Sequence, residues 1–164
     1  MNNRVKNIAV TGMFAAMIYV LTMFVKVPLG PGYVHFGDAM LYVCAMLMGA
    51  PWACIAGAIG EGLADVTGGF GIYFPATALI KVLISLPFIY ARKDEKILSK
   101  RSALMTLPAG IITVIGYYIF DAIVNKAYAF TFVVGNIIQA FGSAVIFIAV
   151  AAALDKTNIR NLFD

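Results

Sequence analysis

Apolar residues fill most of the chain in six blocks, and short clusters of glycine, proline or charged residues separate these blocks. Long apolar runs are typical of helices inside a membrane, whereas clustered prolines and glycines interrupt a helix. The pattern therefore predicts six helices at residues 7–25, 38–48, 51–66, 69–91, 103–125 and 130–154. Residues 26–38 contain two prolines and three glycines, so they are predicted to form a loop that acts as a lid.

A polar stripe runs along the helix predicted at residues 69–91. Tyr73, Thr77, Lys81 and Ser85 recur every four residues, which places them on one face of an otherwise apolar helix. An ammonium group in the bilayer is costly unless it faces the interior of a bundle. We therefore expect Lys81 either to contact a ligand or to form a structural ion pair. For the ion pair, the candidate partners are Glu61, Asp65 and Asp121.

Two further helices carry polar stripes. Tyr117, Asp121 and Asn125 share one face of residues 103–125, with Tyr118 beside them. Asn136, Gln139 and Ser143 share a face of residues 130–154. At about 1.5 Å rise per residue, the three stripes meet in the outer half of the bundle. They predict a substrate-binding cavity, roofed by the loop at 26–38, whose residues are Tyr33, His35, Tyr73, Thr77, Lys81, Tyr117, Tyr118, Asp121, Asn136 and Gln139.

Other polar residues leave their roles open. His35 either contacts a ligand from the loop or is solvated. Asp38 is interpreted as a helix cap, because a carboxylate is favourable in the first turn. Glu61 and Asp65 lie one turn apart, and their spacing permits pairing with Lys81, ligand binding or a position at the wet surface.

Composition identifies the class of protein. Hydrophobic residues make up 62% of the 164 residues, charged residues only 12%, and the mean hydropathy is +0.92. These values are typical of an integral membrane protein, here a single domain over residues 1–164. Cys44 and Cys54 lie in apolar segments without CxxC spacing, which favours buried free thiols, and neither a metal site nor a cofactor is predicted.

Positive charges predict the topology. Nine of the lysines and arginines lie on the side of the N-terminus if there are six spans, whereas Lys26 and Lys126 lie opposite. By the positive-inside rule both termini are cytoplasmic, in a multi-pass membrane protein. Because the basic residues lie between apolar blocks rather than in a patch, nucleic acid is not an expected partner.

The chain lacks the GxxxxGK[ST], HExxH and GxSxG motifs, so no ATPase or other catalytic activity is predicted. A substrate-binding membrane subunit that depends on partners for energy fits best. The alternatives are a small membrane enzyme, which the missing motifs disfavour, and a structural subunit that binds nothing, which the three stripes disfavour.

The stretches AVTGMFAAMIYVLT, GYVHFGDAM, LMGAPWACIAGAIGEGLADVTGGF and IYFPATALIKVLIS, within residues 9–85, resemble the S components of energy-coupling factor (ECF) vitamin transporters. The similarity is to the riboflavin/hydroxymethylpyrimidine-type branch. It implies a six-helix bundle in a bacterial or archaeal plasma membrane that captures a B-vitamin or precursor. It also implies assembly with a transmembrane coupling subunit and two cytoplasmic ATPases, which hydrolyse ATP. Pyridoxine or hydroxymethylpyrimidine is the favoured substrate, and riboflavin is the alternative.

The resemblance also implies a role for the first helix. The family's AxxxA coupling motif corresponds to Gly12 and Ala16, with glycine in place of the first alanine. Both residues are small, and such pairs permit close approach of a second helix. That second helix is either the coupling partner or another helix of the same bundle.

Overall fold

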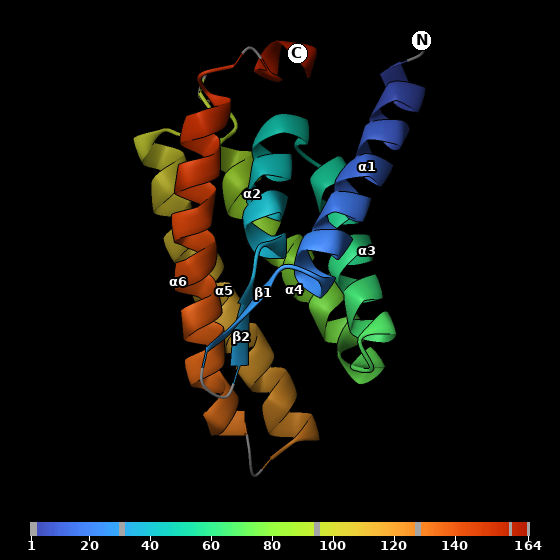
Figure 1. The fold of residues 1–164 in the computed structure, drawn as a ribbon, viewed down its shortest axis with the longest axis vertical. Helices are drawn as coiled ribbons and strands as arrows, with labels where there is room; N and C mark the ends of the chain where they lie inside the picture. Colours follow the sequence, from blue (N-terminus) through green and yellow to red (C-terminus); the bar gives the residue numbers. More distant parts are fainter. Residues whose placement is uncertain (1–2, 30–31, 94–95, 127–128, 158, 164) are drawn as a thin grey trace.

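The computed structural model describes residues 3–29, 32–93, 96–126, 129–157 and 159–163, with side chains except at residues 3, 28, 29, 32 and 33 (Figure 1). The six predicted helices are present in this part of the chain. Their bounds are α1 (Asn3–Met23), α2 (Gly37–Met48), α3 (Trp52–Thr67), α4 (Phe74–Ala91), α5 (Lys100–Val124) and α6 (Ala129–Leu154). The helix predicted from residue 69 begins later, because the 3-10 turn η1 (Gly71–Tyr73) precedes α4.

The segment predicted as a loop contains an antiparallel hairpin of β1 (Lys26–Leu29) and β2 (Gly32–His35). Lys26 pairs with His35 and Val27 with Val34. Strand β2 packs against α6, and Gly142 of α6 permits this approach, since a Cβ there would lie 2.6 Å from the Val34 side chain. The hairpin therefore packs against the helical bundle through α6.

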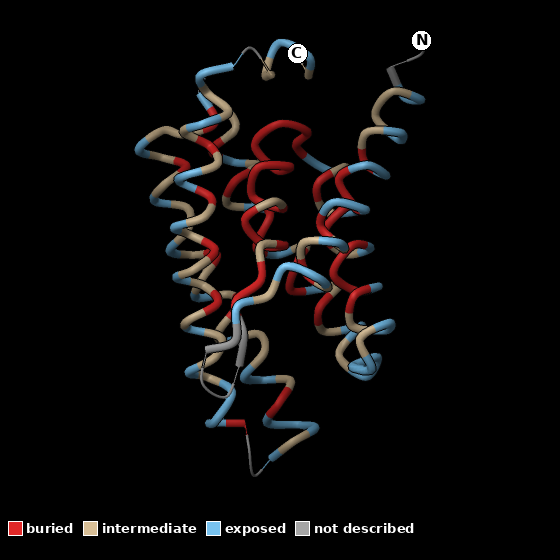
Figure 2. Tube along the Cα trace, in the orientation of Figure 1, coloured by how far each residue is buried: buried red, intermediate tan, exposed pale blue. Residues whose placement is uncertain are grey.

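Helix α2 lies at the centre of the bundle and packs against α1, α3, α4 and α6. Eleven of its twelve residues are buried (Figure 2). A helix that is apolar on all sides is stable only when it is enclosed in this way. The ring of Tyr42 stacks on Phe88 at 4.2 Å, and Phe147 meets both rings edge-on. These rings form part of the apolar core.

The outer helices expose apolar side chains. Leu107, Ile111 and Ile115 on α5 and Phe141 and Val145 on α6 are all more than half exposed. Four helical segments are long and apolar enough to cross a membrane, namely Arg4–Met23, Gly71–Ala91, Lys100–Val124 and Ala129–Leu154. Helix α2 has 12 residues and α3 has 16, so the predicted six crossings remain a prediction.

The start of α1 and the short 3-10 helix η2 (Ile159–Leu162) lie at the same end of the molecule (Figure 1). The Lys6 ammonium donates to the Leu162 carbonyl at 2.6 Å, and the rings of Phe14 and Phe163 lie 6.2 Å apart. The hairpin and the turn between α3 and α4 lie toward the opposite end.

Candidate functional site

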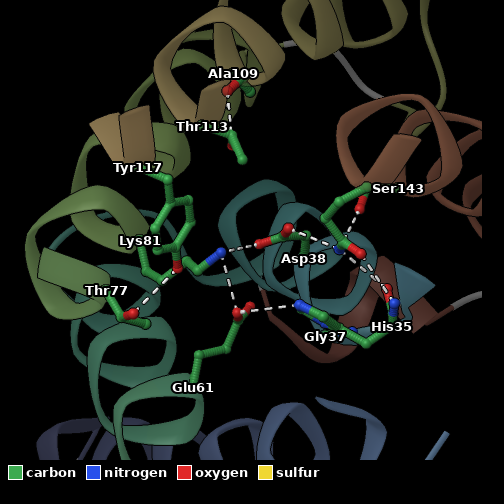
Figure 3. A network of polar contacts seen from close by, with 11 residues as sticks. His35, Gly37, Asp38, Glu61, Thr77, Lys81, Ala109, Thr113, Tyr117 and Ser143 are labelled. Atoms are coloured by element: carbon green, nitrogen blue, oxygen red, sulfur yellow. Dashed lines mark hydrogen bonds and ion pairs between the residues drawn. The ribbon is translucent and has the colours of Figure 1, made fainter. Parts of the chain in front are cut away.

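Lys81 lies midway along α4 and is only 1% exposed. Its ammonium donates to Asp38 Oδ1 at 2.7 Å and lies 3.0 Å from Glu61 Oε2 (Figure 3). The ion pair therefore joins α4 to α2 and α3. Of the three partners considered from the sequence, Glu61 is one, whereas the bond to Asp38 was not foreseen.

The interpretation of Asp38 as a helix cap is wrong. Phe36 is the N-cap of α2 and forms no side-chain cap bond, whereas the Asp38 carboxylate accepts hydrogen bonds from Lys81 and Gln139. One signal in the sequence could have revealed this: the ten residues after Asp38 in α2 include no charged residue. A helix of that kind is buried, and a carboxylate in its first turn is then buried with it.

Gln139 on α6 connects the hairpin to the ion pair. Its amide oxygen accepts the His35 backbone N–H at 2.9 Å, and its amide nitrogen donates to the His35 carbonyl at 3.2 Å and to Asp38 Oδ2 at 2.9 Å. The amide nitrogen also lies 3.0 Å from Ser143 Oγ. One side chain thus orients the end of β2 and one carboxylate of the ion pair.

The His35 side chain is 11% exposed, and burial lowers the pKa of its imidazole to about 4. The ring is therefore neutral at neutral pH. Nδ1 accepts the Gly37 N–H at 3.2 Å, which leaves the proton on Nε2, 3.8 Å from Glu61 Oε2. Gly37 is required here, because a Cβ at this position would overlap Thr22 Oγ1.

A cavity of about 280 Å³ opens beside the ion pair. Its lining residues are Thr22, His35, Glu61, Asp65, Phe70, Tyr73, Thr77, Lys81, Tyr117, Asp121, Thr131, Phe132, Gly135, Asn136 and Gln139. The three polar stripes predicted from the sequence thus meet at one cavity, which eight of the ten predicted site residues line. Phe70, Thr131 and Phe132 were missed because no polar stripe marks them.

Two predicted site residues do not join this set. Tyr118 is 42% exposed and does not line the cavity, so its assignment to the cavity wall is corrected. It follows Tyr117 directly, and a step of one residue turns a helical side chain by about 100°. The side chain of Tyr33 lies outside the described residues.

The far side of the cavity is held by a second hydrogen-bond cluster. The Tyr73 hydroxyl donates to Asp121 Oδ1 at 2.6 Å, and the Asn125 amide donates to the Tyr73 oxygen at 2.7 Å. The hydroxyls of Thr77 and Tyr117 are 3.1 Å apart. Helix α4 and the turn η1 before it are thereby joined to α5.

His35, Asp38 and Glu61 each offer a ligating atom, and these atoms lie within 4.8 Å of one another. The Lys81 ammonium already lies against both carboxylates. It supplies the positive charge that a metal ion would otherwise provide.

A groove with a volume of about 730 Å³ lies between α1 and α3. Gly12 and Ala16 are exposed in it, and no atom beyond its own helix backbone and chain neighbours lies within 4 Å of the position of a Gly12 Cβ. The other lining residues are mainly apolar: Ile8, Thr11, Ala15, Tyr19, Trp52, Ile55, Ile59, Leu63 and Thr67. The small-residue face predicted on the first helix is therefore open at this point.

Comparison with known proteins gives one family and one relative. The sequence model of the family described as "ECF-type riboflavin transporter, S component" matches residues 2–156. A stretch of 69 residues is 38% identical to an uncharacterized protein in a gap 3'region of Pyrococcus woesei. That stretch covers 41% of this chain and 43% of the relative, so the chain matches less than half of the relative's length.

Proposed function

Because the chain belongs to the S-component family of ECF-type riboflavin transporters, we propose that it is the substrate-capture subunit of an ECF-type ABC transporter that imports a B-vitamin or a vitamin precursor. The cavity beside Lys81 is the observation that supports this role most directly. It combines aromatic walls with a few oriented polar groups, as small-molecule sites do.

The size of the cavity favours a small substrate. Ligand pockets usually measure about 300–1,000 Å³, and this one, at about 280 Å³, falls just below that range. A single-ring heteroaromatic such as pyridoxine or hydroxymethylpyrimidine is therefore the favoured cargo. Riboflavin, which the family description names, is the alternative.

The partners proposed are a transmembrane coupling subunit and two cytoplasmic ATPases. S components are transport subunits rather than enzymes, so energy must come from such partners. The groove between α1 and α3 is the proposed contact with the coupling subunit, since Gly12 and Ala16 leave its floor open to another helix.

The proposed orientation has six membrane crossings with both termini in the cytoplasm. The contact between Lys6 and Leu162 supports placing both ends on one side. A cysteine at Lys96, in a variant without Cys54, should be shielded from an impermeant thiol reagent in intact cells, whereas one at Val27 should react. Labelling at Lys96 in intact cells contradicts this orientation.

A vitamin panel tests the proposed function. The purified protein is screened by thermal shift against pyridoxine, hydroxymethylpyrimidine, riboflavin and other B-vitamins. A ligand that binds only the folded state raises the melting temperature by mass action. One compound or a few close analogues should stabilise the protein, and a flat response across the whole panel contradicts vitamin capture.

A further inference from the structure

Polar atoms at one wall of the cavity lack partners. Glu61 is 2% exposed, and its Oε1 accepts no hydrogen bond from the described residues. The same holds for Asp65 Oδ2 one turn later on α3, which is also enclosed. Both residues line the cavity. Buried acceptors without donors are costly, so these two oxygens indicate what the site lacks.

Three of the donors that line the cavity already hold acceptors of the protein itself. Lys81 is directed to Asp38 and to the other Glu61 oxygen, and the Gln139 amide nitrogen to Asp38 and the His35 carbonyl. The Tyr73 hydroxyl donates to Asp121. Among the described residues that line the cavity, the buried side-chain atoms without a partner are two carboxylate oxygens and the Thr22 hydroxyl, so the unpaired oxygens of ionisable groups are acceptors.

The charges in the cavity also favour a ligand that donates hydrogen bonds. Asp38 and Lys81 form one close pair, and His35 is neutral at neutral pH. Glu61, Asp65 and Asp121 line the cavity, and Lys81 is the only lysine or arginine among the described residues that line it. Carboxylates therefore outnumber cations, an arrangement that attracts a positive group and repels a carboxylate or phosphate.

We propose that the cavity selects a flat heteroaromatic ligand that carries an amine or a protonated ring nitrogen, and that Glu61 and Asp65 accept its N–H groups. The two carboxylates lie four residues apart on one face of α3, so they can address neighbouring donors along one edge of a ring. Phe70 and Phe132 provide aromatic surface in the same cavity. This inference rests on the proposed function and narrows its substrate class.

Two matched pairs of probes test it. Pyridoxamine is compared with pyridoxine, in which a hydroxyl replaces the amine, and hydroxymethylpyrimidine is compared with the analogue in which oxygen replaces the ring-attached amine. In at least one pair the amine should bind about ten- to a hundred-fold more tightly, since hydrogen bonds to charged groups are the strong ones. Equal or tighter binding of the oxygen compound in both pairs overturns the inference.

Variants assign the preference to α3. Asp65→Asn should remove most of the discrimination within the pair, measured as the ratio of the two dissociation constants. Glu61→Gln should act in the same direction, but Glu61 also contacts Lys81, so Asp65→Asn is the deciding variant. The matched control is Asp155→Asn, because Asp155 accepts the Ile97 and Leu98 backbone N–H groups away from the cavity. If Asp65→Asn still prefers the amine to the oxygen compound as strongly as the unmodified protein does, the assignment of this preference to α3 is overturned.

Failure of this inference and failure of the proposed function differ in outcome. If riboflavin binds and neither probe pair does, vitamin capture stands and the amine preference is overturned. If no vitamin on the panel binds, the proposed function itself fails, and the inference fails with it.

Discussion

The cavity beside Lys81 measures about 280 Å³ and is lined by carboxylates, amides, hydroxyls and aromatic rings, whereas the groove between α1 and α3 measures about 730 Å³ and is almost wholly apolar. Hydrogen bonds and ion pairs connect the cavity residues and Asp38 across five helices, α2 to α6, and strand β2. In the groove, Gly12 meets open space. A change in the cavity should therefore affect both folding and binding, whereas a change in the groove should affect only what docks there.

The largest expected effect is on transport, through the groove. Gly12→Leu or Ala16→Leu should abolish uptake by the complete transporter while leaving ligand affinity and melting temperature nearly unchanged, because bulk blocks close helix approach. Uptake assays and thermal shifts on the same variants measure this. Met13→Leu is the control, since Met13 is exposed on α1 outside the groove. Lost ligand binding in Gly12→Leu would mean that this face belongs to the fold.

Lys81→Met should give the largest loss of stability. It leaves Asp38 and Glu61 buried without their cation, and breaking a buried pair costs about 3–5 kcal/mol. The melting temperature of the ligand-free protein should fall, and ligand affinity should fall with it. Adding Asp38→Asn should restore part of the melting temperature, because one unpaired charge is removed. A large fall in melting temperature with unchanged affinity would contradict a role for Lys81 in the ligand site.

Asp121→Asn should have an intermediate effect on binding. It keeps the shape of the side chain but removes the charge that accepts the Tyr73 hydroxyl. Asp121 also lines the cavity, where its ionised oxygens can accept a hydrogen bond from the ligand. Losing a charge-assisted hydrogen bond to the ligand costs about 1.5–3 kcal/mol, or roughly ten- to a hundred-fold in affinity. Titration of the stabilising vitamin measures the change. Tyr118→Leu should bind the ligand normally, because Tyr118 does not line the cavity. A comparable loss of affinity in Tyr118→Leu would contradict the set of cavity-lining residues described above.

The smallest effects concern stability, and they distinguish the open groove at Gly12 from the packed contact between α1 and α3 at Gly60. At Gly60 a Cβ would lie 2.7 Å from the Ala15 carbonyl oxygen, so Gly60→Ala should destabilise the protein by about 1–3 kcal/mol. Gly12→Ala meets nothing and should be neutral, or stabilising by up to about 1 kcal/mol, because alanine favours a helix. Melting temperatures of the two variants measure the difference, and equal destabilisation would show that the groove is not open.

Most of the helices and much of the cavity could be predicted from the sequence. Apolar blocks and the glycines and prolines between them mark the six helices, because these features act locally. The spacing of Tyr73, Thr77 and Lys81 also predicts a shared face, which the cavity confirms. Helical periodicity determines which side chains lie together on one helix, and that information is contained in a few neighbouring residues.

The partners across the bundle were decided by the tertiary structure. Lys81 and Asp38 are 43 residues apart, and they meet because the short helix α2 is enclosed at the centre of the bundle. His35 and Gln139 are 104 residues apart, and their bonds attach the hairpin to α6. Periodicity within one helix carries no information about which face of another helix lies opposite. Packing around α2 determines that choice, because each buried charge and the His35 end of β2 must find a partner in the enclosed interior.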